Sequence, residues 1–192
     1  MSFYTDNFNR DNEDPIASPW TTRINGVSDL RIVSNVVYGE TDNNDSDAYY
    51  SGGTFTGSQF SQVQIAVASL TDGVGVWARL QAGAHSGYAF YWSVGAGAWK
   101  LRRVDAGSFQ TSMQESATPS PSQNDTIKIE ASGSTIKGYV NGVLVCSGTD
   151  STYSTGYPGI KCNDSADAID NWAGGDIAYD QDLRFVIELH SG

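Results

Sequence analysis

The fold is decided by residues 136–160, which read IKGYVNGVLVCSGTDSTYSTGYPGI. Asn141-Gly142 separates two runs in which apolar side chains alternate with polar ones. A two-residue type I′ turn needs positive φ at both central positions, and Asn followed by Gly meets that need. A loop rich in Ser, Thr and Asp follows, and GYPGI at 156–160 leads into a third apolar run. The stretch therefore predicts a β-hairpin followed by a further strand.

The rest of the chain alternates with the same period of two residues, and helical periodicity is almost absent. Glycine supplies 21 of the 192 residues, which is typical of short strands joined by tight turns. Besides the hairpin and the strand after it, we expect strands at 20–24, 30–37, 48–50, 60–69, 74–80, 87–93, 98–104, 126–131 and 183–189.

The segment 116–124, SATPSPSQN, is the most loop-like part of the chain. The strands after it are too few to form a stable second domain, so we interpret it as a surface loop. The sequence therefore predicts one all-β domain over 1–192, built as a two-sheet antiparallel β-sandwich.

Acidic residues outnumber basic ones by 22 to 11, which gives a formal net charge of −11. An acidic surface repels nucleic-acid phosphates and anionic lipids, so neither nucleic acid nor a membrane is an expected partner. Asp is concentrated at 42–47 and 164–170, and we interpret both clusters as solvated loops.

Two cysteines, Cys146 and Cys162, lie in or just after the opening stretch. They could form a disulfide if their strands are neighbours, or remain as two buried thiols that pack like small apolar side chains. The only histidines, His85 and His190, lie far from both in sequence, so no Cys/His metal-binding motif is present.

Several short motifs, in order, resemble the concanavalin A-like lectin/glucanase superfamily, and most closely its small LamG-like jelly-roll modules. The motifs are DNFNR at 6–10, PWT at 19–21, VGVWAR at 74–79, GY at 87–88, GYVNGV at 138–143, Asp150, GYPGI at 156–160 and DNW at 170–172. The resemblance implies a concanavalin A-like jelly roll in which two curved antiparallel sheets face each other and the N- and C-terminal strands lie together. It also implies that Trp20 and Trp172 are structural.

Members of this superfamily often hold a structural calcium ion where the terminal strands meet. The matching motifs make Asp6 and Asp170 the candidate ligands, and calcium the candidate cofactor, because calcium prefers hard oxygen donors. The alternative is that Asp6 caps a turn of its own backbone, as Asp often does.

The superfamily also includes glycoside hydrolases, which need two carboxylates about 5–5.5 Å apart for a retaining mechanism. The glutamates of this chain are isolated from one another, and Glu130 has no acidic partner at strand spacing. We therefore expect no catalytic residues and no enzymatic activity.

A carbohydrate-binding module needs aromatic rings that stack on sugars, flanked by polar side chains on an open face. Trp77, Arg79, Tyr91, Lys100 and Arg102 are the candidate ligand-binding residues, because the alternation places them on one face of three strands. The alternative is that Trp77 packs beneath a loop and Arg79 serves in an ion pair.

The N-terminus has neither the basic nor the apolar region of a secretory signal peptide. Together with the acidic exterior and the missing catalytic set, this favours a non-catalytic lectin-like protein of a phage virion, in decoration or adhesion. Such a protein would lie on the virion surface or outside the cell after lysis, with glycans or other virion proteins as partners. The alternative is a carbohydrate-binding module of a polysaccharide-active system.

Overall fold

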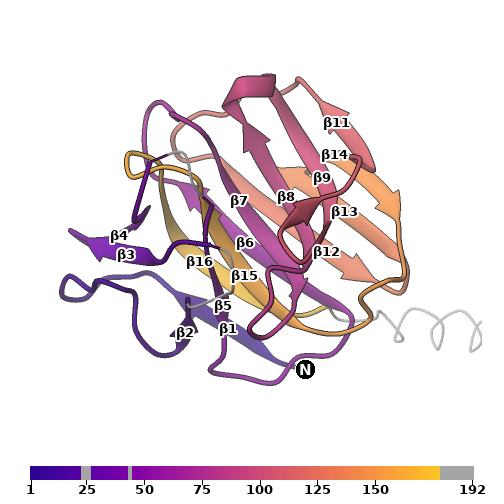
Figure 1. Ribbon diagram of the computed structural model, residues 1–192, viewed down its shortest axis with the longest axis horizontal. Coiled ribbons are helices and arrows are strands. Elements are labelled where there is room, and N and C mark those ends of the chain that lie inside the picture. The colour runs from indigo at the N-terminus through magenta and orange to yellow at the C-terminus, as the bar shows by residue number, and fades with distance from the viewer. Residues whose placement is uncertain (23–26, 43–44, 178–192) are drawn as a thin grey trace, which may run out of the picture.

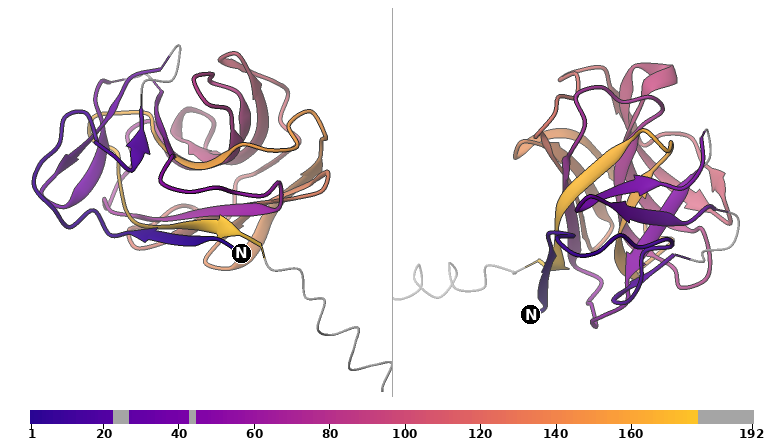
Figure 2. Two further views of the ribbon diagram at one scale, coloured as in Figure 1. Left: turned by 90° about the horizontal axis from the view of Figure 1, so that it is seen from below. Right: turned by 90° about the vertical axis from the view of Figure 1, so that its left-hand side faces the viewer.

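The computed structural model describes residues 1–22, 27–42 and 45–177 and shows two antiparallel sheets packed face to face (Figure 1, Figure 2). Sheet A has eight strands in the order β14-β13-β12-β6-β16-β4-β3, with β1 paired to β16. Its strands are β1 (Phe3–Asp6), β3 (Leu30–Val33), β4 (Val36–Gly39), β6 (Gln59–Ile65), β12 (Thr126–Ser132), β13 (Thr135–Val140), β14 (Val143–Thr149) and β16 (Ala168–Asp176).

Sheet B also has eight strands, in the order β10-β9-β8-β7-β15-β5-β2, with β11 paired to β9. They are β2 (Trp20–Thr21), β5 (Ser46–Tyr50), β7 (Val74–Leu80), β8 (Gly87–Ser93), β9 (Ala98–Asp105), β10 (Ser108–Phe109), β11 (Gln114–Ser116) and β15 (Tyr157–Cys162). The only helical element of the described residues is a 3-10 turn, Val94–Ala96, and none of their helices could span a bilayer. The predicted all-β sandwich is confirmed.

The hairpin at the centre of the sequence argument is present as β13 and β14. Asn141 and Gly142 have φ values of 50° and 77°, as the type I′ turn requires. The chain then crosses to sheet B, where β15 lies between β7 and β5. A second turn of the same kind, at Ser34 and Asn35, divides the predicted strand at 30–37 into the hairpin of β3 and β4.

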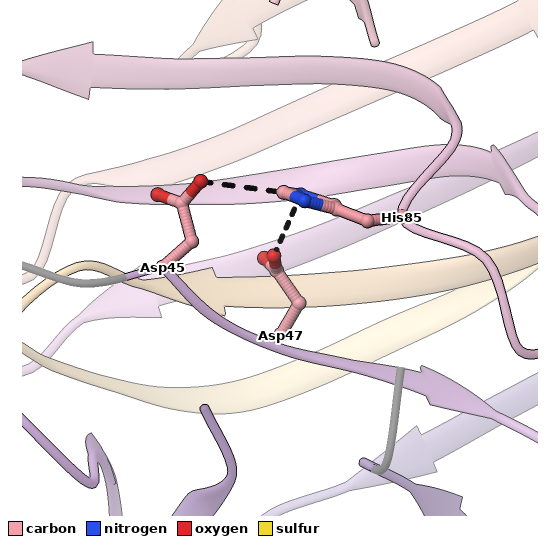
Figure 3. Close-up of side chains that lie close together, drawn as sticks. All are labelled: Asp45, Asp47 and His85. Atoms are coloured by element: carbon pink, nitrogen blue, oxygen red, sulfur yellow. Dashed lines mark ion pairs between the residues drawn. The ribbon is translucent and has the colours of Figure 1, made fainter. Parts of the chain in front are cut away.

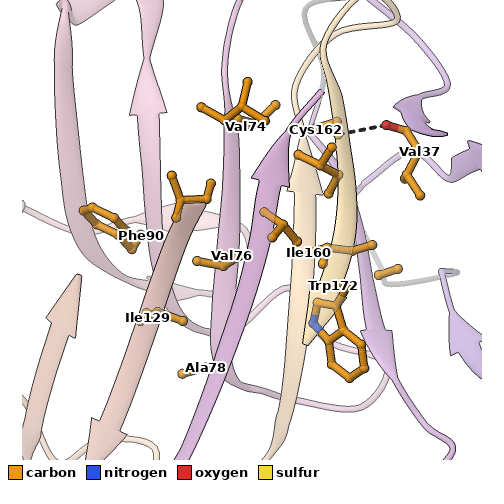
Figure 4. Packing of buried hydrophobic residues seen from close by; sticks show 14 of the residues in the cluster. Val37, Val74, Val76, Ala78, Phe90, Ile129, Ile160, Cys162 and Trp172 are labelled. Atoms are coloured by element: carbon orange, nitrogen blue, oxygen red, sulfur yellow. Dashed lines mark hydrogen bonds between the residues drawn. The ribbon is translucent and has the colours of Figure 1, made fainter. Parts of the chain in front are cut away.

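Buried aliphatic and aromatic side chains from both sheets form the main core (Figure 4). The alternation predicted for β6 is present, since Val63 and Ile65 point into this core. Cys146 lies in sheet A and Cys162 in sheet B, and both are buried free thiols, so the second of the two cysteine alternatives is confirmed. The Cys162 thiol donates to the carbonyl of Val37 (Sγ···O 3.9 Å).

The terminal strands lie together, as the resemblance implied: β1 runs antiparallel to β16 with Asp6 opposite Trp172 (Figure 2, left). The Trp20 and Trp172 rings meet edge to face with centroids 4.8 Å apart. Trp172 also donates from Nε1 to Ser61 Oγ at 2.9 Å. Both tryptophans are buried and structural. The predicted strand at 183–189, and part of the one at 20–24, lie outside the described residues.

Gly138 offers a test of the packing between the sheets. A Cβ at this position would lie 2.3 Å from Cδ2 of the Phe90 ring, which is fixed in the core. We expect Gly138→Ala to lower the free energy of unfolding by about 1–3 kcal/mol in urea denaturation, because overpacking strains a close-packed interior. The control is Gly95→Ala, where a Cβ meets nothing within 4 Å. Equal stability of the two variants would contradict the packing described here.

Candidate functional site

A bulge in β7 separates Arg79 from the rest of the predicted ligand-binding face. The pairing of β7 with β15 shifts register between Tyr157 and Gly159, and Arg79 has φ of 55°. As a result Leu80 joins Trp77 on the outer side of sheet B, the side turned away from sheet A. The Arg79 guanidinium turns instead toward the Tyr88 ring, 5.9 Å from its centroid. Strict alternation, which placed Arg79 beside Trp77, fails at this bulge.

Arg79 is held at the end of the sandwich by backbone carbonyls of three separate loops. Nε donates to Gly57 O at 2.8 Å, Nη1 to Tyr153 O at 2.8 Å and Nη2 to Gly133 O at 2.9 Å. Only 1% of the residue is exposed. At this end of the sandwich Arg79 forms part of the wall of a hollow of about 740 Å³. The other lining residues are Met1, Thr56, Gly57, Ser58, Gly133, Ser151, Ser154, Asp176 and Ile177.

The other four predicted residues do share the outer face of sheet B. Tyr91 of β8 is opposite Lys100 of β9, and the neighbouring row carries Trp77 and Arg102, with Ala89 between them. Lys100 and Arg102 are partly exposed, and both pair with Glu115 on β11, at 3.5 and 3.3 Å. The aromatic part of this face is closed, since Tyr91 and Trp77 are buried.

Two side chains cover Trp77 and Tyr91. The His85 ring, from the loop between β7 and β8, lies 5.2 Å from the Trp77 ring. Phe109 of β10 lies 5.7 Å from both His85 and Tyr91, measured between ring centroids. Trp77 is 0% exposed, so in this structure its ring has no face on which a sugar could stack. The alternative of a Trp77 packed beneath a loop is the arrangement found.

Beside Trp77 lies a charged cluster that the sequence analysis missed, made of Asp45, Asp47, His85 and Lys161. Figure 3 shows the first three of these side chains. Trp77 Nε1 donates to Asp47 Oδ1 at 2.7 Å, and His85 Nε2 lies 3.0 Å from Asp47 Oδ2. Lys161 Nζ contacts Asp45 Oδ1 and lies 3.7 Å from Asp47 Oδ1. Asp47 is fully buried, so the interpretation of 42–47 as a solvated loop is wrong at this residue.

Burial and pairing act against each other in this cluster. Burial lowers the pKa of Lys161, but Asp47 and Asp45 outweigh it, and the pKa is raised. For Asp47 burial raises the pKa, while Lys161 and His85 outweigh it, and the pKa is lowered. As arranged, Lys161 and Asp47 form a fully buried ion pair, and the partly exposed Asp45 adds a second negative charge to it.

The cluster also has the donors of a cation site, because one ligand atom each from Asp45, Asp47 and His85 lie within 4.8 Å of one another. Calcium takes 6–8 oxygen ligands, so two carboxylates and an imidazole suit a transition metal better than calcium. The Lys161 ammonium already contacts both carboxylates, and a metal ion would have to displace it. As arranged, the cluster fits a buried ammonium better than calcium.

The predicted calcium ligands lie at the meeting of the terminal strands, but Asp6 is already engaged. Arg10 Nη1 donates to both of its carboxylate oxygens, at 2.8 and 3.0 Å. Trp20 Nε1 donates to Oδ2 and the Phe8 backbone N–H to Oδ1, both at 2.8 Å. Asp6 thus caps its own turn, the stated alternative. Because Arg10 already holds both oxygens of Asp6, this site, too, does not fit calcium as it stands.

No protein-family profile and no curated protein matches the sequence. Solved structures do match in fold. The carbohydrate-binding module CBM66 from Bacillus subtilis has a TM-score of 0.63 and 20% identity over 82% of this chain and 92% of the module. The Ca²⁺/Man-bound exoplasmic/lumenal domain of VIP36 has a TM-score of 0.63 at 9% identity, over 85% of each chain. The fold is that of the concanavalin A-like lectins and glucanases.

Similar structures with this lectin/glucanase fold are not all binding domains. The apo Crh5 transglycosylase has a TM-score of 0.58 at 11% identity, over 93% of this chain and 85% of that one. The one close pair of carboxylates in the charged cluster, Asp45 and Asp47, is not arranged for such chemistry. Lys161 contacts both, and Asp47 is fully buried.

The arrangement around Asp6 predicts how the protein responds to calcium. Because Arg10 occupies both carboxylate oxygens, we expect the same melting temperature in excess calcium and in a chelator. The Arg10→Ala variant frees Asp6, and calcium should then raise the melting temperature of that variant only. A calcium-dependent rise for the unaltered chain would contradict the saturated state of Asp6.

Proposed function

We propose that this protein is a non-catalytic, lectin-like module that binds a neutral oligosaccharide in the hollow beside Arg79. The observation that carries the proposal is the hollow itself. Its volume of about 740 Å³ falls within the usual range for small-ligand sites. Solved structures with the same fold, the carbohydrate-binding module CBM66 and the Man-bound domain of VIP36, support the proposal through the shared fold.

The lining of the hollow suits a ligand rich in hydroxyl groups. Ser151 and Ser154 contribute side-chain hydroxyls to this lining, and a hydroxyl can both donate and accept hydrogen bonds. The loops around them are fixed by Arg79, whose three hydrogen bonds to carbonyls join the ends of several strands. A net charge of −11 disfavours acidic glycans, so the proposed ligand is neutral.

An exposed aromatic ring lies next to this hollow. Phe3 is 66% exposed and its ring centroid is 6.2 Å from that of Phe60. Both line a neighbouring hollow of about 480 Å³, which shares Asp176 and Ile177 with the larger one. All five tryptophans of the chain are buried, so Phe3 offers the best-exposed apolar ring face for stacking among the described residues.

The absence of catalysis is part of the proposal. It is supported by the contact of Lys161 with both carboxylates of the buried cluster and by the engagement of Asp6 with Arg10. Accumulation of new reducing ends when the purified chain is incubated with neutral polysaccharides would contradict this absence of catalysis.

A place on a virion surface remains a proposal drawn from the sequence. One observation is compatible with it: Val143 and Leu144, at the tip of the β13–β14 hairpin, are 66% and 50% exposed and could contact another protein. Recovery of the protein from purified phage particles would support this setting, and its absence from them would contradict it.

The binding site can be tested with a glycan array and two tryptophan substitutions. We expect the unaltered chain to bind neutral oligosaccharides and Ser154→Trp to lose this binding, because the indole fills the hollow. Ser120→Trp places the same ring on an exposed serine of the loop after β11 and should bind normally. Phe3→Ala should weaken binding about tenfold, since covering one ring face is worth roughly 1–2 kcal/mol.

Two results would overturn the assignment. Failure of the unaltered chain to bind any glycan would remove the proposed function. Binding that survives Ser154→Trp but is lost in Arg102→Ala would move the site to the exposed part of the outer face of sheet B.

A further inference from the structure

Lys161 is an unusual residue for the middle of a sheet. It is 0% exposed, and its strand neighbours on the two sides are Asp47 of β5 and Gly75 of β7. Among the described residues, Lys161 Nζ, His85 Nε2 and Asp47 Oδ2 are buried without a hydrogen bond of normal geometry. The N–H groups of a buried ammonium normally all have hydrogen-bond acceptors, and those of Lys161 depart from this rule.

Aromatic side chains shield the lysine from water. Its Nζ lies 5.3 Å from the centroid of the Phe109 ring. Trp77 and Tyr91 pack in the same outer cluster as Phe109, and Tyr91 lies close against Gly75, where a Cβ would lie 2.5 Å from Tyr91 Cβ. The amine is thus enclosed with the Asp47 carboxylate in a largely apolar space, and the Asp45 side chain, 24% exposed, lies at the edge of that space.

We propose that Lys161 and Asp45 join in an intramolecular isopeptide bond that links β15 to the segment entering β5. Lys161 Nζ already contacts a carboxylate oxygen of Asp45, so the nucleophile lies beside the carbon that it must attack. Asp47 is less suited as the acceptor, because Trp77 donates to its Oδ1 and Lys161 Nζ lies 3.7 Å from that oxygen.

Asp47 is instead the proton carrier. In the minor state in which the Lys161 ammonium has given one proton to Asp47, the neutral amine attacks Asp45 Cγ and loses a second proton as it does so. The N–C bond forms, one C–O bond of the Asp45 carboxyl breaks, and the oxygen leaves with both protons as water. An ammonium and a carboxylate thereby become an amide and one water molecule, with no change in oxidation state and no cofactor.

Physical reasons favour this reaction here and not in solution. Two groups held in contact react as if at effective molarities of about 10⁵–10⁸ M in well-oriented cases. A buried ion pair carries a desolvation cost for each ion, and conversion of Lys161 and Asp45 to a neutral amide removes that cost for these two groups.

The test is the intact mass of the purified full-length chain in denaturant, followed by fragmentation. We expect a mass lower than that of the sequence by one water molecule, and a branched peptide joining Lys161 to Asp45. Lys161→Arg keeps the positive charge but lacks the nucleophilic amine, so it should have the full mass.

Each alternative outcome overturns the proposal. If the unaltered chain has the full mass of its sequence, the bond is excluded. The same holds if native mass spectrometry finds that full mass plus a metal ion bound to the cluster. If Lys161→Arg also has a mass lower by one water molecule, the loss indicates a succinimide at Asp45-Ser46. That result would exclude the isopeptide bond as well.

The role of Asp47 has its own readout. In Asp47→Ala the ion pair between Lys161 and Asp45 is retained, and bond formation after synthesis, followed as the loss of one water from the intact mass over time, should slow by about 10²-fold or more, the usual contribution of a positioned acid–base group. An unchanged rate in a folded Asp47→Ala variant would exclude Asp47 as the proton carrier.

Discussion

The buried ammonium of Lys161 is the constraint on which the outer face of sheet B depends. A lone charge in an apolar interior is too costly to persist, so the fold must supply counter-charges. It does so from β5, where Asp47 is the direct strand neighbour of Lys161, and from Asp45 just before that strand. His85 then closes over Asp47 from the loop between β7 and β8.

This pairing determines where a ligand can bind. The side chains that balance Lys161 also hold Trp77 through Asp47 and cover it with His85, so the aromatic centre of the outer face is interior. The bulge at Arg79 has the opposite effect at the end of the same strand. It turns a long cationic side chain toward the loops, where Arg79 forms part of the wall of the hollow of about 740 Å³. One strand, β7, thus supplies both the closed face and the wall of the open hollow.

The sequence predicted most of the fold because the deciding signals are local. Asn141-Gly142 fixes its turn through backbone conformation alone, and the alternation around Val63 needs no knowledge of the partner strand. The site was harder, since Arg79 follows the alternation rule until a bulge, set by the pairing of β7 with β15, interrupts it. The Lys161–Asp47 pair depends on the register between strands more than a hundred residues apart, which no local pattern encodes. The only hint was a lysine inside an otherwise apolar strand.

The importance of Lys161 is tested most directly by comparing the stability of Lys161→Met with that of Lys128→Met. Lys128 pairs with Glu130 at 2.7 Å on the outer side of sheet A, where it is partly exposed. Removing a buried partner leaves uncompensated carboxylates, so Lys161→Met should lose about 3–5 kcal/mol of unfolding free energy. Removing the surface partner should cost about 0–1 kcal/mol. Equal and small losses in the two variants would contradict the central place given to the buried ammonium.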